Sequence, residues 1–353
     1  MMDLLVLTIK VLLIYLTIIQ VVPIMVWVER KGAALIQDRP GPNRVGPFGL
    51  FQPIADSVKF LFKEDPIPQQ ANRFLFVLAP FLGLLPASLT IAVLPIADHA
   101  MIFGSKVFIQ IADLNIGLLY FLAIGSLGIY GILFGGWASN NKYSLIGAMR
   151  ASSQMISYEI PFALAAAGAV TVFGTFSLRQ IVLLQEGTWM GLPNWGVLYQ
   201  PLGFLLFFIS AFAETNRLPF DLPETEAELV AGFHTEYGSM KFATFFMAEY
   251  MNLATISGMM TALYFGGWHL PWVSDASLVG IVGSRNWVAL LQVIVFFTKV
   301  AFFMIVFVWV RWTIPRFRFD QLMRLAWENL IPLGLINILA TALVLYLTAG
   351  GHP

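Results

Sequence analysis

Residues 213–242 read AETNRLPFDLPETEAELVAGFHTEYGSMKF, and this acidic stretch lies between two long apolar runs. Only Arg217 and Lys241 supply positive charge within it. Six of the twenty acidic residues of the chain fall here, namely Glu214, Asp221, Glu224, Glu226, Glu228 and Glu236. A plain connector between two apolar segments has no use for six carboxylates. They either form a solvated face or are held close together for proton chemistry.

The residues around Asp221 predict the start of a helix. Glu224 follows Asp221 by three residues with Pro223 between them, which is the pattern of a capping box with proline in the first turn. Glycine commonly follows the last turn of a helix, so Gly232 is a plausible stop. The sequence therefore predicts a helix over residues 222–233.

The predicted helix would place Asp221, Glu224 and Glu228 on one face, while Glu226 points away. An acidic first turn that satisfies the helix dipole explains Asp221 and Glu224 equally well. It does not explain Glu228, which lies a full turn further on. Carboxylates stacked on one face raise each other's pKa and titrate as a group, as a proton-loading site beside a membrane requires.

The composition indicates a membrane protein. The 353 residues are 58% apolar and only 11% charged, and the mean hydropathy is +0.78. Apolar runs of nearly twenty residues recur, so the fold class is an all-α integral membrane protein with several spans. A net charge of zero excludes a general role in nucleic-acid binding.

The chain has no cysteine, which excludes disulfides, zinc–thiolate sites and iron–sulfur ligation by this chain. Any redox centre must therefore be carried by a partner. No metal site is expected either, because the histidines do not have the spacing of metal ligands. They are His99, His234, His269 and His352.

We expect eight transmembrane helices in a single polytopic domain, because the apolar runs match the thickness of a bilayer. The first run is too long for a signal peptide and is not followed by a cleavage site, so it is the first span. The predicted spans are residues 4–28, 74–97, 116–137, 157–176, 196–213, 242–265, 288–310 and 327–349.

The distribution of basic residues predicts the orientation. Fifteen of the twenty Lys and Arg residues flank the odd-numbered loops, and four lie on the opposite side. Basic residues concentrate in cytoplasmic loops, so the odd loops, including the acidic loop 214–241, are predicted to be cytoplasmic and both termini periplasmic. Nothing resembles a mitochondrial transit peptide, so the bacterial plasma (inner) membrane is the simplest location.

The first cytoplasmic loop, residues 29–73, contains an amphipathic segment. From Leu50 to Phe62 the apolar side chains recur at helical spacing, and polar side chains take the other face. This predicts a helix that lies on the membrane surface. A helix packed under a partner subunit would have the same pattern, and the two roles are compatible.

Lys10, Glu159, Glu249 and Lys299 are ionisable residues within predicted spans. Lys10 lies near one end of its span and can reach the interface. A charge at the centre of a bilayer costs about 2.5–3.5 kcal/mol on insertion scales, so the others are expected to face the protein interior or water. Glu249 and Lys299 are candidates for function, with a structural ion pair as the alternative. Glu159 could also reach the interface.

Long motifs in the loops and spans resemble those of one family. The motifs are VERKGAALIQDRPGPNRVGPFGLFQPIADSVKFLFKED at 28–65, GWASNNKYSLIGAMRASSQMISYE at 136–159, AETNRLPFDLPETEAELVAGFHTEY at 213–237, FFMAEY at 245–250 and PRFRFDQLM at 315–323. In order and in position they resemble the quinone-site membrane subunits of proton-pumping NADH:quinone oxidoreductase, respiratory complex I. The match covers the eight spans and nearly all the cytoplasmic loops.

The resemblance implies a quinone chamber beside this chain, with an apolar tunnel that accepts the tail of ubiquinone or menaquinone. The quinone-binding positions that it implies are Glu29, Arg30, Asp56, Phe246, Met247 and Arg311. It implies that Asp221, Glu224, Glu226 and Glu228 respond to quinone reduction, and that Glu159, Glu214 and Glu249 lead protons onward. With Lys299 they form the predicted proton-coupling set.

The resemblance also implies partners and cofactors. FMN and iron–sulfur clusters would be carried by peripheral subunits, quinone would be the substrate, and no catalytic residue would act in this chain alone. Small membrane subunits, antiporter-like subunits and membrane lipid would complete the surroundings.

Three alternative functions remain open at this point. The first is the related membrane subunit of a membrane-bound hydrogenase or formate-oxidising complex, against which the complete loop from Arg30 to Asp65 argues. The second is a free-standing ion or solute transporter, which would be expected to show an internal repeat. The third is a structural anchor, which would have no reason to hold Glu249 and Lys299 in lipid.

Overall fold

The computed structural model describes residues 2–102, 105–189, 191–221 and 229–348. The described chain is a bundle of long helices, together with two short two-stranded antiparallel sheets. Six helical segments are long and apolar enough to cross a membrane: Val6–Ile36, Arg73–Val93, Gly117–Ala138, Lys142–Phe173, Arg285–Thr313 and Phe319–Thr348. The chain is a multi-pass membrane protein, as its composition predicts.

The six segments correspond to the following elements. They are α1 (Met2–Ile36), α3 (Arg73–Thr90) with η2 (Ile91–Val93), α4 (Gly117–Ser126) with α5 (Gly128–Ala138), α6 (Lys142–Phe173), α13 (Arg285–Thr313), and α14 (Phe319–Arg324) with the π-helix η4 (Leu325–Leu330) and α15 (Ile331–Thr348). The shorter elements are η1 (Pro47–Gly49), α2 (Gln52–Phe62), β1 (Ala97–Ile102), β2 (Ser105–Ile109), α7 (Leu178–Leu184), β3 (Thr188–Trp189), β4 (Leu192–Pro193), α8 (Gly196–Tyr199), η3 (Gly232–His234) and α12 (Asp275–Val282).

Two further helices occupy the remaining predicted spans. α9 (Pro201–Glu214) is apolar but has only 14 residues, which is about 21 Å at 1.5 Å per residue and shorter than a bilayer core of about 30 Å. α11 (Ser239–Tyr264) is long enough, but it carries Lys241 and Glu249. The count of eight spans remains a prediction.

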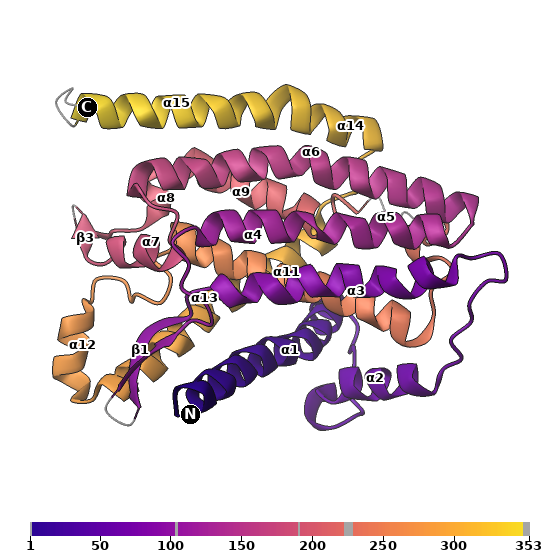
Figure 1. Cartoon of the computed structure of the whole chain (residues 1–353), viewed down its shortest axis with the longest axis horizontal. Helices are drawn as coiled ribbons and strands as arrows, with labels where there is room; N and C mark the ends of the chain where they lie inside the picture. Colours follow the sequence, from indigo (N-terminus) through magenta and orange to yellow (C-terminus); the bar gives the residue numbers. More distant parts are fainter. Residues whose placement is uncertain (1, 103–104, 190, 222–228, 349–353) are drawn as a thin grey trace.

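α11 can be this polar because other helices shield it from lipid. Most of its side chains are buried, and it packs against α3, α13, α1 and α2. Figure 1 shows α11 inside the bundle, with α1 and α15 on opposite edges. The central position of α11 lets its polar groups find partners within the protein.

The two ends of the bundle differ. The N-terminal end of α1, the C-terminal end of α15, α7, α12 and the β1–β2 hairpin gather at one end, and α2 and α14 lie toward the other (Figure 1). Both termini at one end fit the predicted even number of crossings. Which end faces the periplasm remains a prediction.

Asp98 anchors the β1–β2 hairpin to the helices. It accepts hydrogen bonds from Arg179 of α7 at 2.7 Å and from Arg285 of α13, and its neighbour His99 lies 2.7 Å away. Burial alone would raise the pKa of Asp98, but the hydrogen bonds from Arg179 and His99 hold it below its ordinary value. The hairpin is therefore fixed by a carboxylate that stays ionised.

The amphipathic segment of the first loop forms α2, and this prediction is confirmed. Its apolar side chains face outward, and Phe62 is 86% exposed. α2 packs on α1 and α11 through its other face. The exposed apolar face suits a membrane surface or a partner.

Gly131 allows α3 and α5 to pack closely. A Cβ atom on Gly131 would lie 2.5 Å from the backbone nitrogen of Gly83 and 2.8 Å from its Cα. Backbone atoms cannot move aside as a flexible side chain can. This contact therefore requires a residue without a side chain on α5.

We predict that Gly131→Ala destabilises the protein by about 1–3 kcal/mol through overpacking. The matched control is Gly128→Ala on the same helix, where a Cβ would meet nothing within 4 Å. Because alanine is the better helix former, the control should be neutral or slightly stabilising. Thermal unfolding of both variants in detergent measures the difference, and equal midpoints would contradict the close approach.

Candidate functional site

A buried carboxylate near the end of α1 gathers donors from three other parts of the chain. Glu29 is 8% exposed. Arg217, in the turn after α9, donates to it at 3.1 Å, and Tyr250 of α11 donates at 2.5 Å. Arg311 of α13 also pairs with it. A buried carboxylate with this many donors is held ionised in one position.

Arg217 is shared between two carboxylates. In addition to its contact with Glu29, Arg217 places its Nε 2.7 Å from Glu249 Oε1. Its guanidinium also stacks 4.3 Å from the ring centre of Tyr250. Arg217 is 3% exposed. With Arg311, the cluster holds two acids and two arginines and is balanced in charge, which a buried site requires. We call Glu29, Arg217, Glu249, Tyr250 and Arg311 the ion cluster.

Asp221 lies beside the ion cluster, at the end of a described segment. It is 4% exposed and accepts a hydrogen bond from Arg316 at 3.1 Å. Burial raises the pKa of Asp221 to about 6, although Arg316 acts in the opposite direction and Glu249 adds to the rise. A carboxyl group with this pKa can take up and release a proton near neutral pH.

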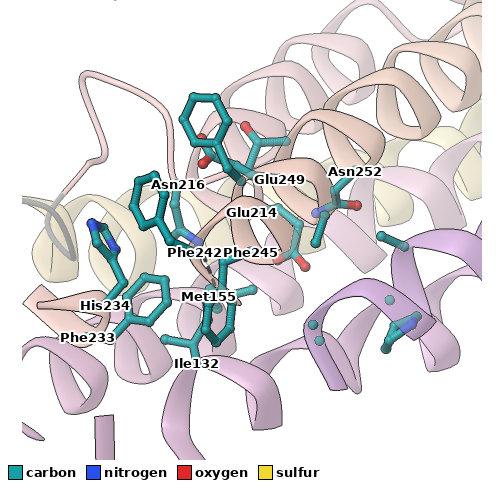
Figure 2. A pocket seen from close by; sticks show the side chains of 18 residues that line it. Ile132, Met155, Glu214, Asn216, Phe233, His234, Phe242, Phe245, Glu249 and Asn252 are labelled. Carbon is teal, nitrogen blue, oxygen red and sulfur yellow. Dashed lines mark hydrogen bonds between the residues drawn. The ribbon is translucent and has the colours of Figure 1, made fainter. Parts of the chain in front are cut away.

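A cavity of about 80 Å³ adjoins the ion cluster. Figure 2 shows Glu214, Asn216, Glu249 and Asn252 among its lining, opposite the aromatic rings of Phe242 and Phe245. This volume holds a few water molecules, whereas ligand pockets usually have about 300–1,000 Å³. The cavity is therefore suited to water and protons rather than to a quinone ring.

A second, smaller cavity continues from the first. It has about 10 Å³, roughly the space of one water molecule. Glu214 and Asn252 line both cavities, and Glu159 of α6 lines the smaller one. Glu249, Glu214 and Glu159 thus form a series of carboxylates connected by spaces for water.

His234 is a further titratable group on the wall of the larger cavity. Burial lowers its pKa to about 4, so the imidazole is neutral at physiological pH. A neutral imidazole adds no charge to the cavity, and the carboxylates dominate its electrostatics.

The residues implied for quinone binding lie close together on α1, α2, α11 and α13. Arg30 forms an ion pair with Asp56, which ties α1 to α2, and the Arg30 side chain is 46% exposed. Phe246 and Met247 are half-buried on α11, and the Phe246 ring meets that of Tyr250 at 4.9 Å. Together with Glu29 and Arg311, these residues form what we call the quinone face.

Lys299 lies apart from the carboxylates. Its Nζ donates to the backbone carbonyls of Phe265, Gly267 and His269 at 2.8, 2.9 and 2.7 Å. These carbonyls lie in the loop that follows α11. The geometry gives Lys299 a structural role in fixing this loop, and its predicted part in proton coupling gains no support from its neighbours.

The rest of the acidic stretch is described only at its ends. Glu224, Glu226 and Glu228 lie outside the described residues, together with most of the predicted helix over 222–233. In the described end of the predicted helix only Leu229 is α-helical, and a turn follows at Val230, whose φ is 67°. Gly232 begins η3 instead of ending the predicted helix. Glu236 accepts a hydrogen bond at 2.6 Å from Asn141, the residue before α6.

Sequence reasoning missed three residues of the site. Arg217, Tyr250 and Arg316 supply most of the donors to the buried acids. Arg217 could have been suspected as the only arginine in the acidic stretch. Tyr250 and Arg316 fall within the quoted motifs FFMAEY and PRFRFDQLM, but nothing in those motifs predicts that they donate to buried acids.

Comparison with known proteins identifies the family. A family model described as NADH dehydrogenase matches residues 9–342. The chain belongs to this family. It is 51% identical over 315 residues to an H subunit of NADH-quinone oxidoreductase from Cytophaga hutchinsonii, covering 89% of each chain. The H subunit from Bdellovibrio bacteriovorus is 46% identical over 369 residues, covering 96% of each.

A third NADH dehydrogenase relative is the H subunit from Flavobacterium johnsoniae, which is 49% identical over 322 residues and covers 90% of this chain and 89% of its own length. These relatives are named as subunits of NADH-quinone oxidoreductase, so the resemblance seen in the sequence motifs is confirmed. Together with the six apolar helices, they identify a multi-pass protein of the bacterial inner membrane.

We predict that Arg217→Gln destabilises the protein by about 3–5 kcal/mol, because it leaves the buried Glu29 and the half-buried Glu249 without their shared cation. The matched control is Arg318→Gln, which removes an ion pair with Asp320 whose side chains are 75% and 54% exposed. The control should change the unfolding midpoint very little. Equal losses in the two variants would show that the ion cluster is not a stabilising centre.

We predict an unusual pH dependence from Asp221. Its folded pKa of about 6 lies above its ordinary value, so its contribution to stability is fully present below about pH 4 and is lost as the pH rises through 6. Asp221→Asn removes this titration. The unfolding free energy of the wild type relative to the variant should therefore fall by about 1–3 kcal/mol between pH 4 and 7.

The control for this prediction is Asp98→Asn in the β1–β2 hairpin. The hydrogen bonds from Arg179 and His99 hold the pKa of Asp98 below its ordinary value, so its contribution to stability is lost as the pH falls. Any pH-dependent difference in the control should therefore have the opposite sign. A difference between wild type and Asp221→Asn that is constant with pH would refute the raised pKa.

Proposed function

We propose that this chain is the membrane subunit of a proton-pumping NADH:quinone oxidoreductase, that it forms much of the quinone chamber, and that it couples quinone reduction to proton translocation. The observation that carries the proposal is the continuity between the ion cluster and the carboxylates along the two cavities. The printed names of the bacterial relatives support the enzyme assignment.

The quinone would bind against the quinone face. The larger cavity is too small for it, so the headgroup would lie where this face meets a peripheral subunit. Arg311 Nε and Arg217 Nη2 are buried and have no hydrogen-bond partner among the described residues. Buried donors of this kind would be satisfied by water or by a quinone oxygen.

Electrons would reach the quinone from partner subunits. This chain has no cysteine to ligate an iron–sulfur cluster, so FMN and clusters would be held elsewhere in the assembly. The part of this chain is to bind the substrate and to respond to its charge. Antiporter-like and small membrane subunits would receive the protons.

Coupling would begin in the ion cluster. A unit charge 4 Å from another changes its energy by about 4 kcal/mol at an effective dielectric constant of about 20. Negative charge on a reduced quinone near Arg311 and Arg30 would therefore compete with Glu29 for its cations. Arg217 would pass this change on to Glu249, because it contacts both carboxylates. If its contact with one carboxylate became stronger, its contact with the other would become weaker.

Protons would then move along the cavities. Glu249 and Glu214 line the larger cavity and Glu159 lines the smaller one, so water could connect the three carboxylates. Asp221, whose raised pKa reflects its burial and its interaction with Glu249, would serve as a loading group together with Glu224, Glu226 and Glu228 of the acidic stretch.

We predict that Glu214→Gln, made in the assembled enzyme, lowers NADH:quinone reductase activity and proton translocation at least about 10-fold, since positioned proton-transfer groups contribute 10²–10⁴-fold. The amide has the same shape but cannot carry the proton. NADH oxidation with an artificial acceptor should be unchanged, because that reaction takes place on partner subunits.

The control is Glu64→Gln, since Glu64 is exposed in the first loop and lines neither cavity. This variant should keep wild-type rates in every assay. Wild-type quinone reduction and pumping in Glu214→Gln would remove the carboxylate series from the proposal.

A further inference from the structure

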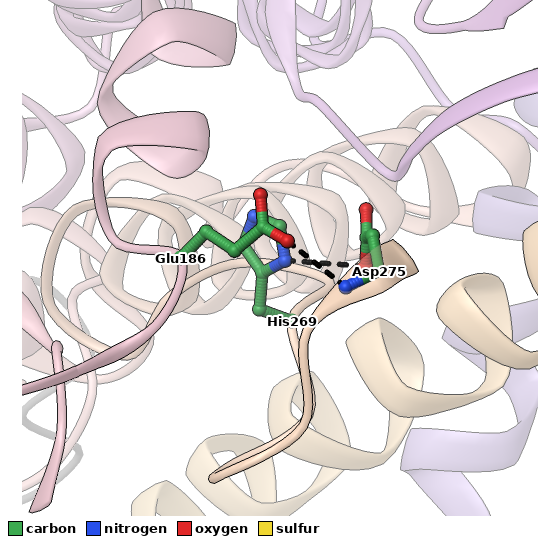
Figure 3. Close-up of side chains that lie close together, drawn as sticks. All are labelled: Glu186, His269 and Asp275. Atoms are coloured by element: carbon green, nitrogen blue, oxygen red, sulfur yellow. Dashed lines mark hydrogen bonds and ion pairs between the residues drawn. The ribbon is translucent and has the colours of Figure 1, made fainter. Parts of the chain in front are cut away.

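A second group of ionisable side chains lies at the opposite end of the bundle. Glu186 follows α7, His269 lies in the loop after α11, and Asp275 is the first residue of α12. One potential ligand atom from each residue lies within 4.8 Å of the other two. Figure 3 shows the three side chains converging from separate segments.

His269 is buried without hydrogen bonds to its ring. The residue is 2% exposed, and neither ring nitrogen has a hydrogen-bond partner in the described part of the chain. Nδ1 lies 3.4 Å from Asp275 Oδ1, which is within the range of an ion pair but is not a hydrogen bond. A buried imidazole whose ring nitrogens have no hydrogen-bond partner destabilises the fold unless a ligand binds to it.

The two carboxylates are held in position through one oxygen each. Glu186 Oε1 accepts the backbone N–H of Asp275 at 2.9 Å, and Asp275 Oδ2 accepts a hydrogen bond from Gln292 at 2.9 Å. Asp275 Oδ1 is buried and has no hydrogen-bond partner in the described chain. Each acid is thus oriented by one oxygen and offers the other to a ligand.

The surroundings of the site are also fixed. Gln292, which orients Asp275, accepts the backbone N–H of Asp98 at 3.2 Å through its own oxygen. Lys299 donates to the carbonyl of His269 at 2.7 Å and so fixes its loop. Groups that orient the ligands in this way are a regular feature of metal sites.

The charge of the group favours a cation. The group contains two carboxyl groups, and the nearest arginine and lysine side chains have other partners. Arg285 pairs with Asp98, and Lys299 is directed at three backbone carbonyls. A divalent ion would neutralise the two acids.

We propose that Glu186, His269 and Asp275 bind one divalent transition-metal ion, with Zn²⁺ as the best match. One imidazole and two carboxylates suit Zn²⁺, whereas Ca²⁺ and Mg²⁺ prefer oxygen ligands alone. Ligand distances of about 2.0–2.2 Å require the three atoms to approach to roughly 3.5 Å of one another, which small side-chain rotations provide. Water would complete the tetrahedron.

The ion would join three segments that are distant in the sequence. It would link the end of α7, the loop after α11 and the start of α12, and so stabilise the end of the bundle opposite to the ion cluster. The site is separate from the proposed quinone chemistry, so its test does not depend on that proposal.

The test uses the assembled complex, purified through this chain, stripped with EDTA and equilibrated with micromolar Zn²⁺. Bound zinc is measured by mass spectrometry and the unfolding midpoint by thermal scanning. The wild type should bind one more equivalent of zinc than Glu186→Gln or His269→Gln. Zinc should raise the midpoint of the wild type alone, because a ligand that binds only the folded state stabilises it.

Glu186→Gln keeps an acceptor for the backbone N–H of Asp275, so this variant is expected to fold. Its zinc content tests the proposal even if the His269→Gln protein is too unstable to purify. Each variant should lose at least about 10-fold in zinc affinity. The matched control is His99→Gln, because His99 also adjoins a carboxylate, but one already saturated by Arg179 and Arg285.

The control should retain the full zinc content. Equal zinc content in wild type, Glu186→Gln and His269→Gln would overturn the proposal, and so would failure of the wild type to bind zinc at this concentration. A simple ion pair between His269 and Asp275 would give the second result.

Discussion

The position of Arg217 constrains much of the structure. A guanidinium that is 3% exposed must be matched by carboxylates, and the buried Glu29 and the half-buried Glu249 supply them. Glu29 belongs to α1 and Glu249 to α11, and Arg311 of α13 balances the second negative charge. Three helices and the turn after α9 are therefore held in one arrangement, and α11 lies inside the bundle because it carries one of the acids.

The same constraint makes the cluster responsive. Arg217 is shared by two acids, so in the function we propose a new charge at the quinone face would change the contacts of Glu29 and Glu249 together. The adjoining cavity offers space for water rather than for a ligand, and it leads from Glu249 to Glu214 and then toward Glu159. Substrate charge and proton position are linked through this geometry in the function we propose.

Hydrophobic length and periodicity predicted most of the helices, because a span or an amphipathic face such as α2 is encoded in consecutive residues. The ion cluster was only partly predictable. Arg217 and Glu29 are 188 residues apart, and Tyr250 and Glu29 are 221 apart, so no local pattern relates them. The spacing of the histidines also could not show that Glu186 and Asp275 lie beside His269, since these three residues meet only through the fold. Lys299 was expected to act in proton coupling or in an ion pair, but in the fold its ammonium group donates hydrogen bonds to backbone carbonyls instead of pairing with a carboxylate.

The central claim is that this chain is the quinone-reacting membrane subunit of a larger NADH-oxidising enzyme. The most direct test is to purify the chain through a tag in mild detergent, identify the proteins that accompany it, and assay NADH:quinone reductase activity. The account predicts flavin and iron–sulfur subunits in the preparation, with quinone reduction by NADH. A folded chain that purifies alone, or one accompanied by a nickel hydrogenase, would contradict it.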